Sequence, residues 1–180
     1  MFDKIINFFK GEKSSPKIDF EVKDLGLGYI LEYNLHTWVV QNEYKYDWGD
    51  GYFSKEWLIS NGKENALLFY DDSEGLEISV SKKINILQEL NHVREQIIAD
   101  GVPDKRINFD GKTWLLSDEN PCLYSETGKE GQTEMVVWIF TEPEEKEFIS
   151  FSQFGAKKIE GYKGKHIQEF EVSNILPSGK

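Results

Sequence analysis

The stretch that decides the fold is Thr37–Ser60, with the sequence TWVVQNEYKYDWGDGYFSKEWLIS. Its first arm carries aromatic or apolar side chains at alternate positions, namely Trp38, Val40, Tyr44, Tyr46 and Trp48. Successive side chains of a strand point to opposite faces, so this spacing predicts one aromatic face backed by a mostly polar one. The Gly-Asp-Gly sequence at 49–51 supplies a tight turn, because both residue types tolerate positive φ angles. The stretch therefore predicts a long antiparallel hairpin.

The hairpin is followed by further turn and strand signals, so residues 36–82 predict a four-stranded antiparallel meander. Upstream, residues 17–34 predict a short strand through Phe20 and Val22, a turn at Gly26 and Gly28, and a second strand. Downstream, apolar residues at a 3.6-residue period predict one helix over about residues 85–99, with Asn85 as its cap.

The second half again has strand composition, and it contains a faint echo of the first. Four segments predict strands, and they are Lys112–Ser117, Met135–Thr141, Glu147–Gln153 and Ile167–Ile175, with a break in the Gly161–Gly164 region. The echo pairs Trp38 with Trp114, Trp57 with Trp138, and Phe69 with Phe151. We therefore expect a mainly β fold of antiparallel meander sheets, with two related units (36–82 and 112–164) that form a barrel-like or sandwich-like body joined by the helix.

The chain divides into a short segment with a linker, residues 1–16, and a single β-rich domain, residues 17–177. Residues 2–10 predict an amphipathic helix whose apolar stripe consists of Phe2, Ile5, Ile6 and Phe9. Two interpretations stay open for this stripe. It packs on the body or on a protein partner, or it anchors the chain at a membrane surface.

Composition excludes several classes of function. The net charge of −11 disfavours nucleic-acid binding, because phosphate backbones repel such a chain. One cysteine, Cys122, allows no internal disulfide, and the scattered Cys and His residues do not predict a zinc site or any other cofactor site. No apolar run approaches the length of a membrane span, so we expect a cytoplasmic protein, with contact to the inner face of the membrane as the open alternative.

Carboxylates gather at two turns of the predicted meander. Alternate turns of a meander lie at the same end of the sheet, which predicts that five acidic residues lie near one another, namely Asp47, Asp50, Asp71, Asp72 and Glu74. A hard cation such as Ca²⁺, or an organic polyamine, would relieve their repulsion. The alternative is that these are solvated loop ends whose charges are screened by salt.

No catalytic residue is predicted. The step Glu56-Trp57 is a tempting general acid beside an aromatic wall, but neighbouring strand residues face opposite ways. Cys122 has no flanking base or cation and is expected to be an inert thiol. The five tryptophans are expected in the core, where aromatic side chains contribute most of the buried area.

Three pieces of the sequence carry a resemblance to a known family. They are YDWGDGYFSKEWLIS at 46–60, SFSQFGAKKIEGYKG at 150–164 and EFEVSNILP at 169–177. Together they resemble the bacterial family called domain of unknown function 4178, over about residues 25–177. Phe154 departs from the family pattern, in which a Trp precedes the glycine. The resemblance implies an accessory protein and no particular reaction.

The favoured interpretation is a non-catalytic β-rich binding or accessory module, either peripheral to the membrane or part of an assembly. The alternative is a carboxylate-dependent, cation-assisted hydrolase or transferase. A flat or grooved aromatic face would favour the first, and a deep pocket with convergent carboxylates would favour the second.

Overall fold

The computed structural model describes residues 19–179, and their fold is mainly β, as predicted. A 3-10 helix, η1 (Val22–Asp24), precedes the first half, whose strands are β1 (Ile30–Tyr33), β2 (His36–Gly49), β3 (Tyr52–Ser60), β4 (Asn65–Asp71) and β5 (Glu77–Ile84). The helices α1 (Ile86–Glu89) and α2 (Asn91–Asp100) follow. The second half consists of β6 (Arg106–Phe109), β7 (Lys112–Glu126), β8 (Thr133–Thr141), β9 (Glu147–Phe154) and β10 (Lys158–His166). A second 3-10 helix, η2 (Glu169–Glu171), leads into β11 (Val172–Leu176).

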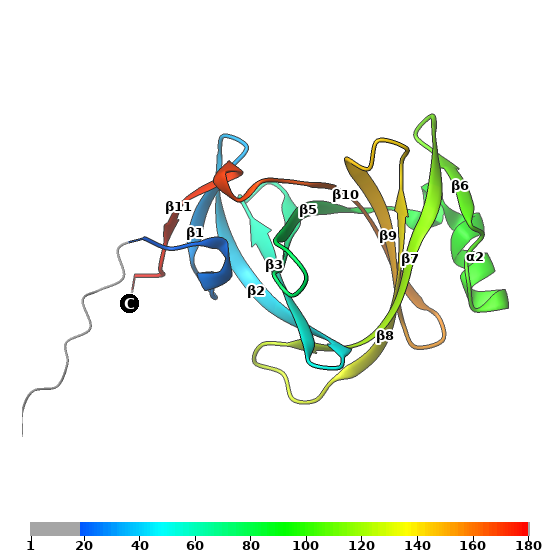
Figure 1. The fold of residues 1–180 in the computed structure, drawn as a ribbon, viewed down its shortest axis with the longest axis horizontal. Helices are drawn as coiled ribbons and strands as arrows, with labels where there is room; N and C mark the ends of the chain where they lie inside the picture. Colours follow the sequence, from blue (N-terminus) through cyan, green and yellow to red (C-terminus); the bar gives the residue numbers. More distant parts are fainter. Residues whose placement is uncertain (1–18, 180) are drawn as a thin grey trace, which may run out of the picture.

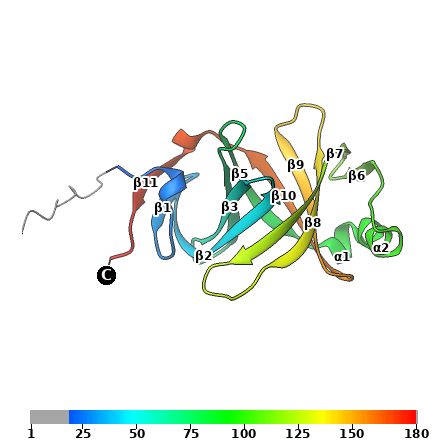
Figure 2. The ribbon, with the colours of Figure 1, turned by 60° about the horizontal axis from the view of Figure 1, so that its bottom comes forward.

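The strands form one antiparallel sheet that closes on itself. Its order is β11-β1-β2-β3-β4-β5-β10-β9-β8-β7-β6, and β2 also pairs with β7. The second pairing joins residues 44–47 of β2 to residues 123–126 of β7. Eight strands, β2 to β5 and β7 to β10, therefore make a closed ring, seen nearly end-on in Figure 1. Of the two expected arrangements the barrel-like one is found, with β1, β11 and β6 extending outward from the ring (Figure 2).

The two halves of the ring repeat the same local design. Each begins with a short strand, continues with a long strand and ends in a three-stranded meander. The indole of Trp38 donates to the carbonyl of Tyr33 at 3.1 Å, and the indole of Trp114 donates to the carbonyl of Phe109 at 3.0 Å. The echo at these two tryptophans therefore corresponds to a shared structure.

A bulge in each long strand changes the face on which its side chains lie. In β2, Val40 pairs with Ile59 while Asn42 pairs with Leu58, so Gln41 is an extra residue. Before the bulge Trp38 and Val40 lie in an apolar core outside the ring, and after it Tyr44, Tyr46 and Trp48 line the interior. The prediction of one continuous aromatic face is wrong, because an extra residue inverts the alternation of a strand. The ladder of β7 shifts in the same way between Leu116 and Asp118.

Two apolar cores lie outside the ring. The first packs β1 to β5 against η1 and β11, around Trp38, Trp57 and Leu68. The second packs β7 to β10 against α1, α2 and β6, around Trp114, Trp138 and Phe151. The core prediction is confirmed for the four tryptophans that are at most 2% exposed, and they are Trp38, Trp57, Trp114 and Trp138. The fifth, Trp48, faces the interior of the ring.

Several local predictions need correction. The expected single helix is two, α1 and α2, because Leu90 between them leaves helical geometry at φ −139°. Asn85 precedes α1 without a side-chain cap, and its backbone N–H donates to Glu89 instead. The expected strand through Phe20 and Val22 is replaced by an irregular segment and η1. In the echo, Phe151 has Leu68 as its equivalent, since both oppose the repeated tryptophan, whereas Phe69 faces the interior.

The expected break at Gly161–Gly164 is the middle of β10. These glycines are required for packing, because a Cβ on Gly161 would lie 2.3 Å from Ile86 and one on Gly164 would lie 2.4 Å from Phe148. A glycine of this kind marks the close approach of two elements. The segment expected at Ile167–Ile175 begins with η2 and becomes a strand only at β11.

Residues 1–18 lie outside the described part of the chain, and with them the predicted stripe of Phe2, Ile5, Ile6 and Phe9. Within residues 19–179, no helix has the length and apolar character needed to cross a membrane.

The role of Gly161 gives a stability prediction. Gly161→Ala should lower the free energy of unfolding by about 1–3 kcal/mol, because the added methyl must displace Ile86 in a packed core. Gly26→Ala is the matched control, since its Cβ would meet only the Tyr29 ring at an ordinary 3.5 Å. Urea denaturation of both variants measures the difference, and equal stabilities would contradict this account of β10.

Candidate functional site

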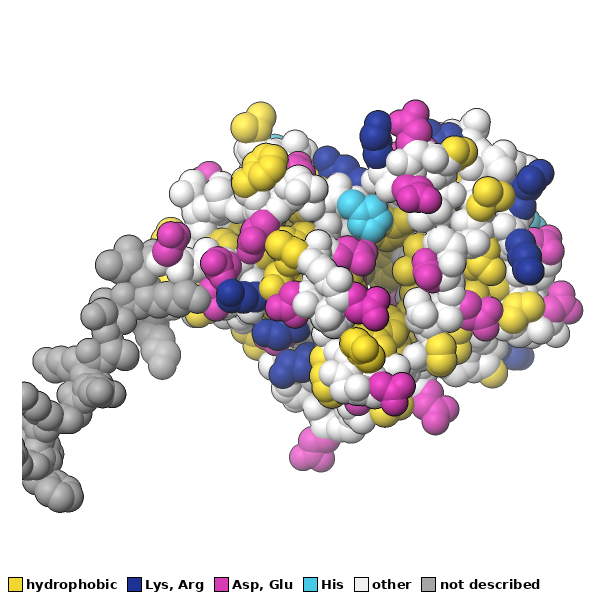
Figure 3. All heavy atoms as spheres, viewed as in Figure 1, with side chains coloured by type: hydrophobic (Ala, Val, Ile, Leu, Met, Phe, Trp, Pro, Cys, Tyr) yellow, Lys and Arg dark blue, Asp and Glu magenta, His cyan; other side chains and the backbone are white. Residues whose placement is uncertain are grey.

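The interior of the ring is a cavity of about 1190 Å³, lined by side chains from all eight ring strands. An eight-stranded closed sheet has space inside for side chains or for one small ligand. The two larger apolar cores lie outside the ring, and a smaller apolar cluster around Tyr46, Met135 and Val137 lies inside it, so the interior combines apolar, aromatic and polar groups. Figure 3 shows the surface hollowed between the two halves, with acidic side chains around the opening.

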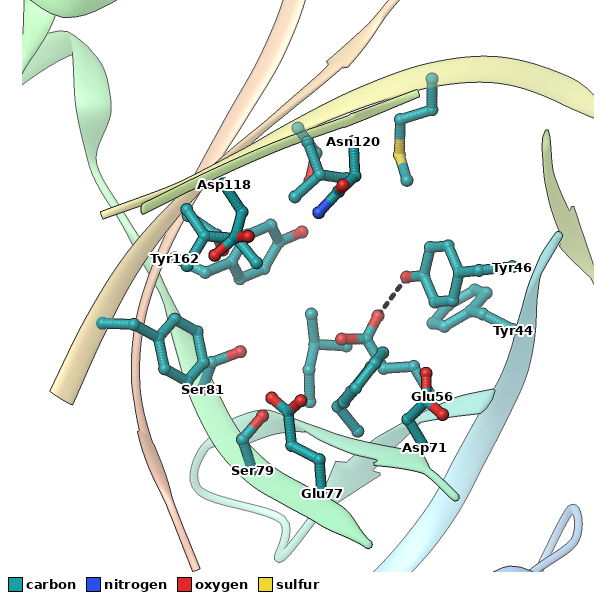
Figure 4. Close-up of a pocket in the computed structure, with 18 of the residues that line it drawn as sticks. Tyr44, Tyr46, Glu56, Asp71, Glu77, Ser79, Ser81, Asp118, Asn120 and Tyr162 are labelled. Carbon is teal, nitrogen blue, oxygen red and sulfur yellow. Dashed lines mark hydrogen bonds between the residues drawn. The ribbon is translucent and has the colours of Figure 1, made fainter. Parts of the chain in front are cut away.

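The charged residues of the cavity wall are mostly acidic. Two of its residues are lysines, Lys83 and Lys158, and eight carry carboxyl groups, namely Glu56, Asp71, Glu74, Glu77, Asp118, Glu126, Glu145 and Glu160. Figure 4 shows carboxyl groups entering from different walls, with Glu77 on β5 and Asp118 on β7. The interior therefore favours positive charge.

Two hydroxyl groups point into this space without a partner. Ser79 and Ser81 on β5 are 4% and 6% exposed, and both line the cavity (Figure 4). Within residues 19–179, neither side chain has a hydrogen bond to another residue. Among the described residues, neither oxygen is one of the fully buried atoms without a partner, so both reach the open space of the cavity and can hydrogen-bond a molecule held there.

Glu56 is the most perturbed carboxyl group of the wall. It lies on β3, and one of its oxygens accepts a hydrogen bond from the hydroxyl of Tyr46 on β2. Burial raises the pKa of Glu56 to about 7, although the hydrogen bond from Tyr46 opposes the rise. Burial, and then the charge of Glu56, also raises the pKa of Tyr46 well above its usual value, so Tyr46 stays a donor. The pair therefore holds an exchangeable proton at the carboxyl group.

Tyrosine rings surround one end of the cavity. The ring centroid of Tyr124 lies 5.5 Å from that of Tyr44 and 5.7 Å from that of Tyr46. Burial raises the pKa of Tyr44 and Tyr124, so their hydroxyl groups are neutral near pH 7. Beside them the ammonium of Lys158 lies 4.6 Å from the centroid of Phe154, so this aromatic end already accommodates one ammonium group.

Two other carboxylates of the wall are held ionised. Glu160 accepts from Tyr162 at 2.6 Å and pairs with Lys83 at 3.1 Å. Burial opposes ionisation of Glu160, but these two contacts outweigh it, and its pKa lies below the usual value. The pKa of Glu126 is also lowered, chiefly by Lys129. Fixed negative charge therefore stands on β10 and on β7, where Glu126 pairs with Tyr44, the residue of β2 that also pairs with Glu56.

The residues predicted at the acidic turns have separate hydrogen-bond partners. Asp47 accepts from the N–H of Gly49, Asp71 accepts from Ser73, and Asp72 accepts from Tyr70. Of the predicted five, Asp71 and Glu74 reach the cavity, and Asp47 lines a separate pocket. Within residues 19–179 no group of three or more His, Cys, Asp or Glu side chains could hold a metal ion. The cation site at these turns, which includes Asp50, stays a prediction without a preformed cluster of ligands.

Sequence reasoning missed Glu56 as a site residue. Trp57 does face away from it, as expected, into the first core. The partner that matters is Tyr46, which the hairpin register places close by on the neighbouring strand. The register of the hairpin, which brings Tyr46 near Glu56, is the signal in the sequence that points to Glu56. Cys122 is buried, and burial raises the pKa of its thiol to about 12, which agrees with an inert thiol.

The sequence model of one protein family, Domain of unknown function (DUF4178), matches residues 26–169. The chain belongs to the DUF4178 family. An uncharacterized protein of Aquifex aeolicus (strain VF5) is 26% identical over 158 residues, which cover 83% of this chain and 81% of the relative. No solved structure matches the chain. The DUF4178 match includes all eight strands of the ring, so the cavity lies within the family domain.

The raised pKa of Glu56 predicts how stability varies with pH. The folded state holds this proton more tightly than the unfolded state, where the pKa is near 4.5, so the wild type loses stability as pH rises from about 4.5 through 7. Glu56→Gln keeps an acceptor for Tyr46 but cannot ionise. Its stability relative to wild type should therefore rise by about 2 kcal/mol between pH 5 and pH 8. Urea denaturation at both values measures this, and parallel pH profiles would contradict the assignment.

Proposed function

We propose that this protein is a non-catalytic binding module that holds a small organic cation inside the strand ring. The observation that carries the proposal is the closed interior itself, whose wall combines carboxylates, aromatic rings and unpartnered hydroxyl groups. A sheet that needed its interior only for stability would fill it with apolar side chains. In this protein the two larger apolar cores are outside the ring, and the smaller apolar cluster inside it leaves a cavity of about 1190 Å³ unfilled.

Three features of the wall support a cation. The carboxyl groups outnumber the lysines, so positive charge is attracted. The faces of Tyr44 and Tyr124 offer cation–π contacts. The hydroxyl groups of Ser79 and Ser81 can accept hydrogen bonds from N–H groups.

The spacing of the wall supports an extended amine in preference to a bare metal ion. Calcium and magnesium require several oxygens around one point, and the described residues gather no such group. Glu77 and Asp118 instead enter from different walls of a large cavity. A linear diamine or polyamine can place one ammonium group near each.

The cytoplasmic setting expected from the sequence is part of the proposal, and the single buried thiol of Cys122 is compatible with it.

Calorimetric titration with spermidine and putrescine tests the proposal. We expect micromolar to low-millimolar binding with one site per chain. The double variant Glu77→Gln/Asp118→Asn should weaken it about tenfold or more, because hydrogen bonds to charged groups contribute about 1.5–3 kcal/mol each.

The matched control is Glu64→Gln/Glu144→Gln, which removes the same charge from two residues outside the cavity. It should bind like wild type. Equal losses in both double variants would reduce the effect to net charge, and no binding in wild type would refute the proposal.

Titration with Ca²⁺ and Mg²⁺ tests the acidic turns separately, where Asp50→Asn with Asp72→Asn should abolish any binding.

The hydrolase or transferase alternative has one specific observation in its favour. The carboxyl group of Glu56, with a pKa of about 7, faces the cavity of the ring, and a general acid or base functions best when its pKa lies near the working pH. The deep pocket with convergent carboxylates is also the form expected for this class. Turnover of an amine ester or amide that is lost in Glu56→Gln would favour the enzyme over the binding module.

A further inference from the structure

Glu56 lies where its carboxyl group can contact a cation bound in the cavity. One oxygen accepts from Tyr46, and the other faces the middle of the cavity without a partner in the described chain (Figure 4). Its cross-strand neighbour on β4 is Phe69, which carries no charge that could neutralise the ionised carboxylate. The carboxyl group therefore has an apolar side, a donor side and an open side.

The other titratable groups around Glu56 come from several elements. The charge of Glu56 raises the pKa of four tyrosines on β2, β7 and β10, namely Tyr44, Tyr46, Tyr124 and Tyr162. The other charged groups and the histidine that share the cavity wall are Asp71, Glu74, Glu77, Lys83, Asp118, Glu126, Glu145, Lys158, Glu160 and His166. Among these, His166 carries the imidazole, and its Nδ1 lies 3.5 Å from Glu77.

We propose that a cationic ligand and a proton compete for Glu56, so that binding of an amine in the cavity releases one proton to solvent. This inference rests on the proposed function, since it concerns the same cavity. In this exchange the neutral acid of Glu56 loses its proton to the buffer, and the resulting carboxylate pairs with an ammonium group that keeps all its own protons.

The direction of the pH effect follows from this exchange. At pH values below the Glu56 pKa of about 7, the ligand must displace a proton. Its affinity therefore falls by a factor of ten for each further pH unit. Above it the carboxylate is already ionised and affinity is constant. Alkyl ammonium groups stay protonated throughout this range, because their pKa resembles that of lysine.

Isothermal titration calorimetry with putrescine at pH 6 and pH 8, in two buffers of different ionisation enthalpy, measures both the affinity and the number of protons released. At pH 6 we expect release of about 0.9 proton, and at pH 8 about 0.1, for a group with a pKa near 7. Affinity should be about tenfold weaker at pH 6. Glu56→Gln should bind with no proton release and with equal affinity at both values.

His166→Gln is the control, and it should keep both the proton release and the pH dependence. Tyr46→Phe gives a second variant, because loss of its hydrogen bond raises the pKa of Glu56 further and should move the affinity midpoint to higher pH. Binding without proton release overturns the inference and leaves the proposed function standing. Release that persists in Glu56→Gln or disappears in His166→Gln also overturns it. No putrescine binding at either pH refutes both.

Discussion

One extra residue in each long strand determines what the rest of the structure can do. The bulges at Gln41 and Ser117 invert the side-chain alternation part-way along β2 and β7. Each strand can then bury apolar residues such as Trp38 or Trp114 outside the ring and still present Tyr46 or Asn120 to its interior. Without the inversion, one face of each strand would have to serve both environments.

This division separates stability from the site. The two outer cores hold most of the buried aromatic side chains, and the pairings of β2 with β7 and of β5 with β10 join the halves. The wall of the cavity is then free to carry groups that burial disfavours. Glu56 is the clearest case, because its ionised form is destabilised by burial and its neutral form is available for exchange. Perturbed groups of this kind gather at functional sites more often than elsewhere.

Local patterns predicted much of the fold, and long-range pairing accounts for the rest. Alternation and Gly-rich turns indicated the meander, and the repeat of Trp38 at Trp114 indicated two related units. Neither bulge has a Gly or Pro signal, so the inverted face was not predictable. The sequence predicts a break at Gly161, because its packing partner Ile86 is distant in the chain and gives no local signal. Ring closure, and with it the cavity, depends on strands that lie far apart in the chain.

The central claim is that the ligand lies inside the ring. The most direct measurement is an isotope-filtered nuclear Overhauser experiment on unlabelled spermidine with the labelled full chain. The account predicts contacts between the spermidine methylenes and the ring protons of Tyr46, Tyr124 and Tyr162, which line the cavity. Contacts confined to the turns at 49–51 and 71–75, or to the outer surface, would contradict it.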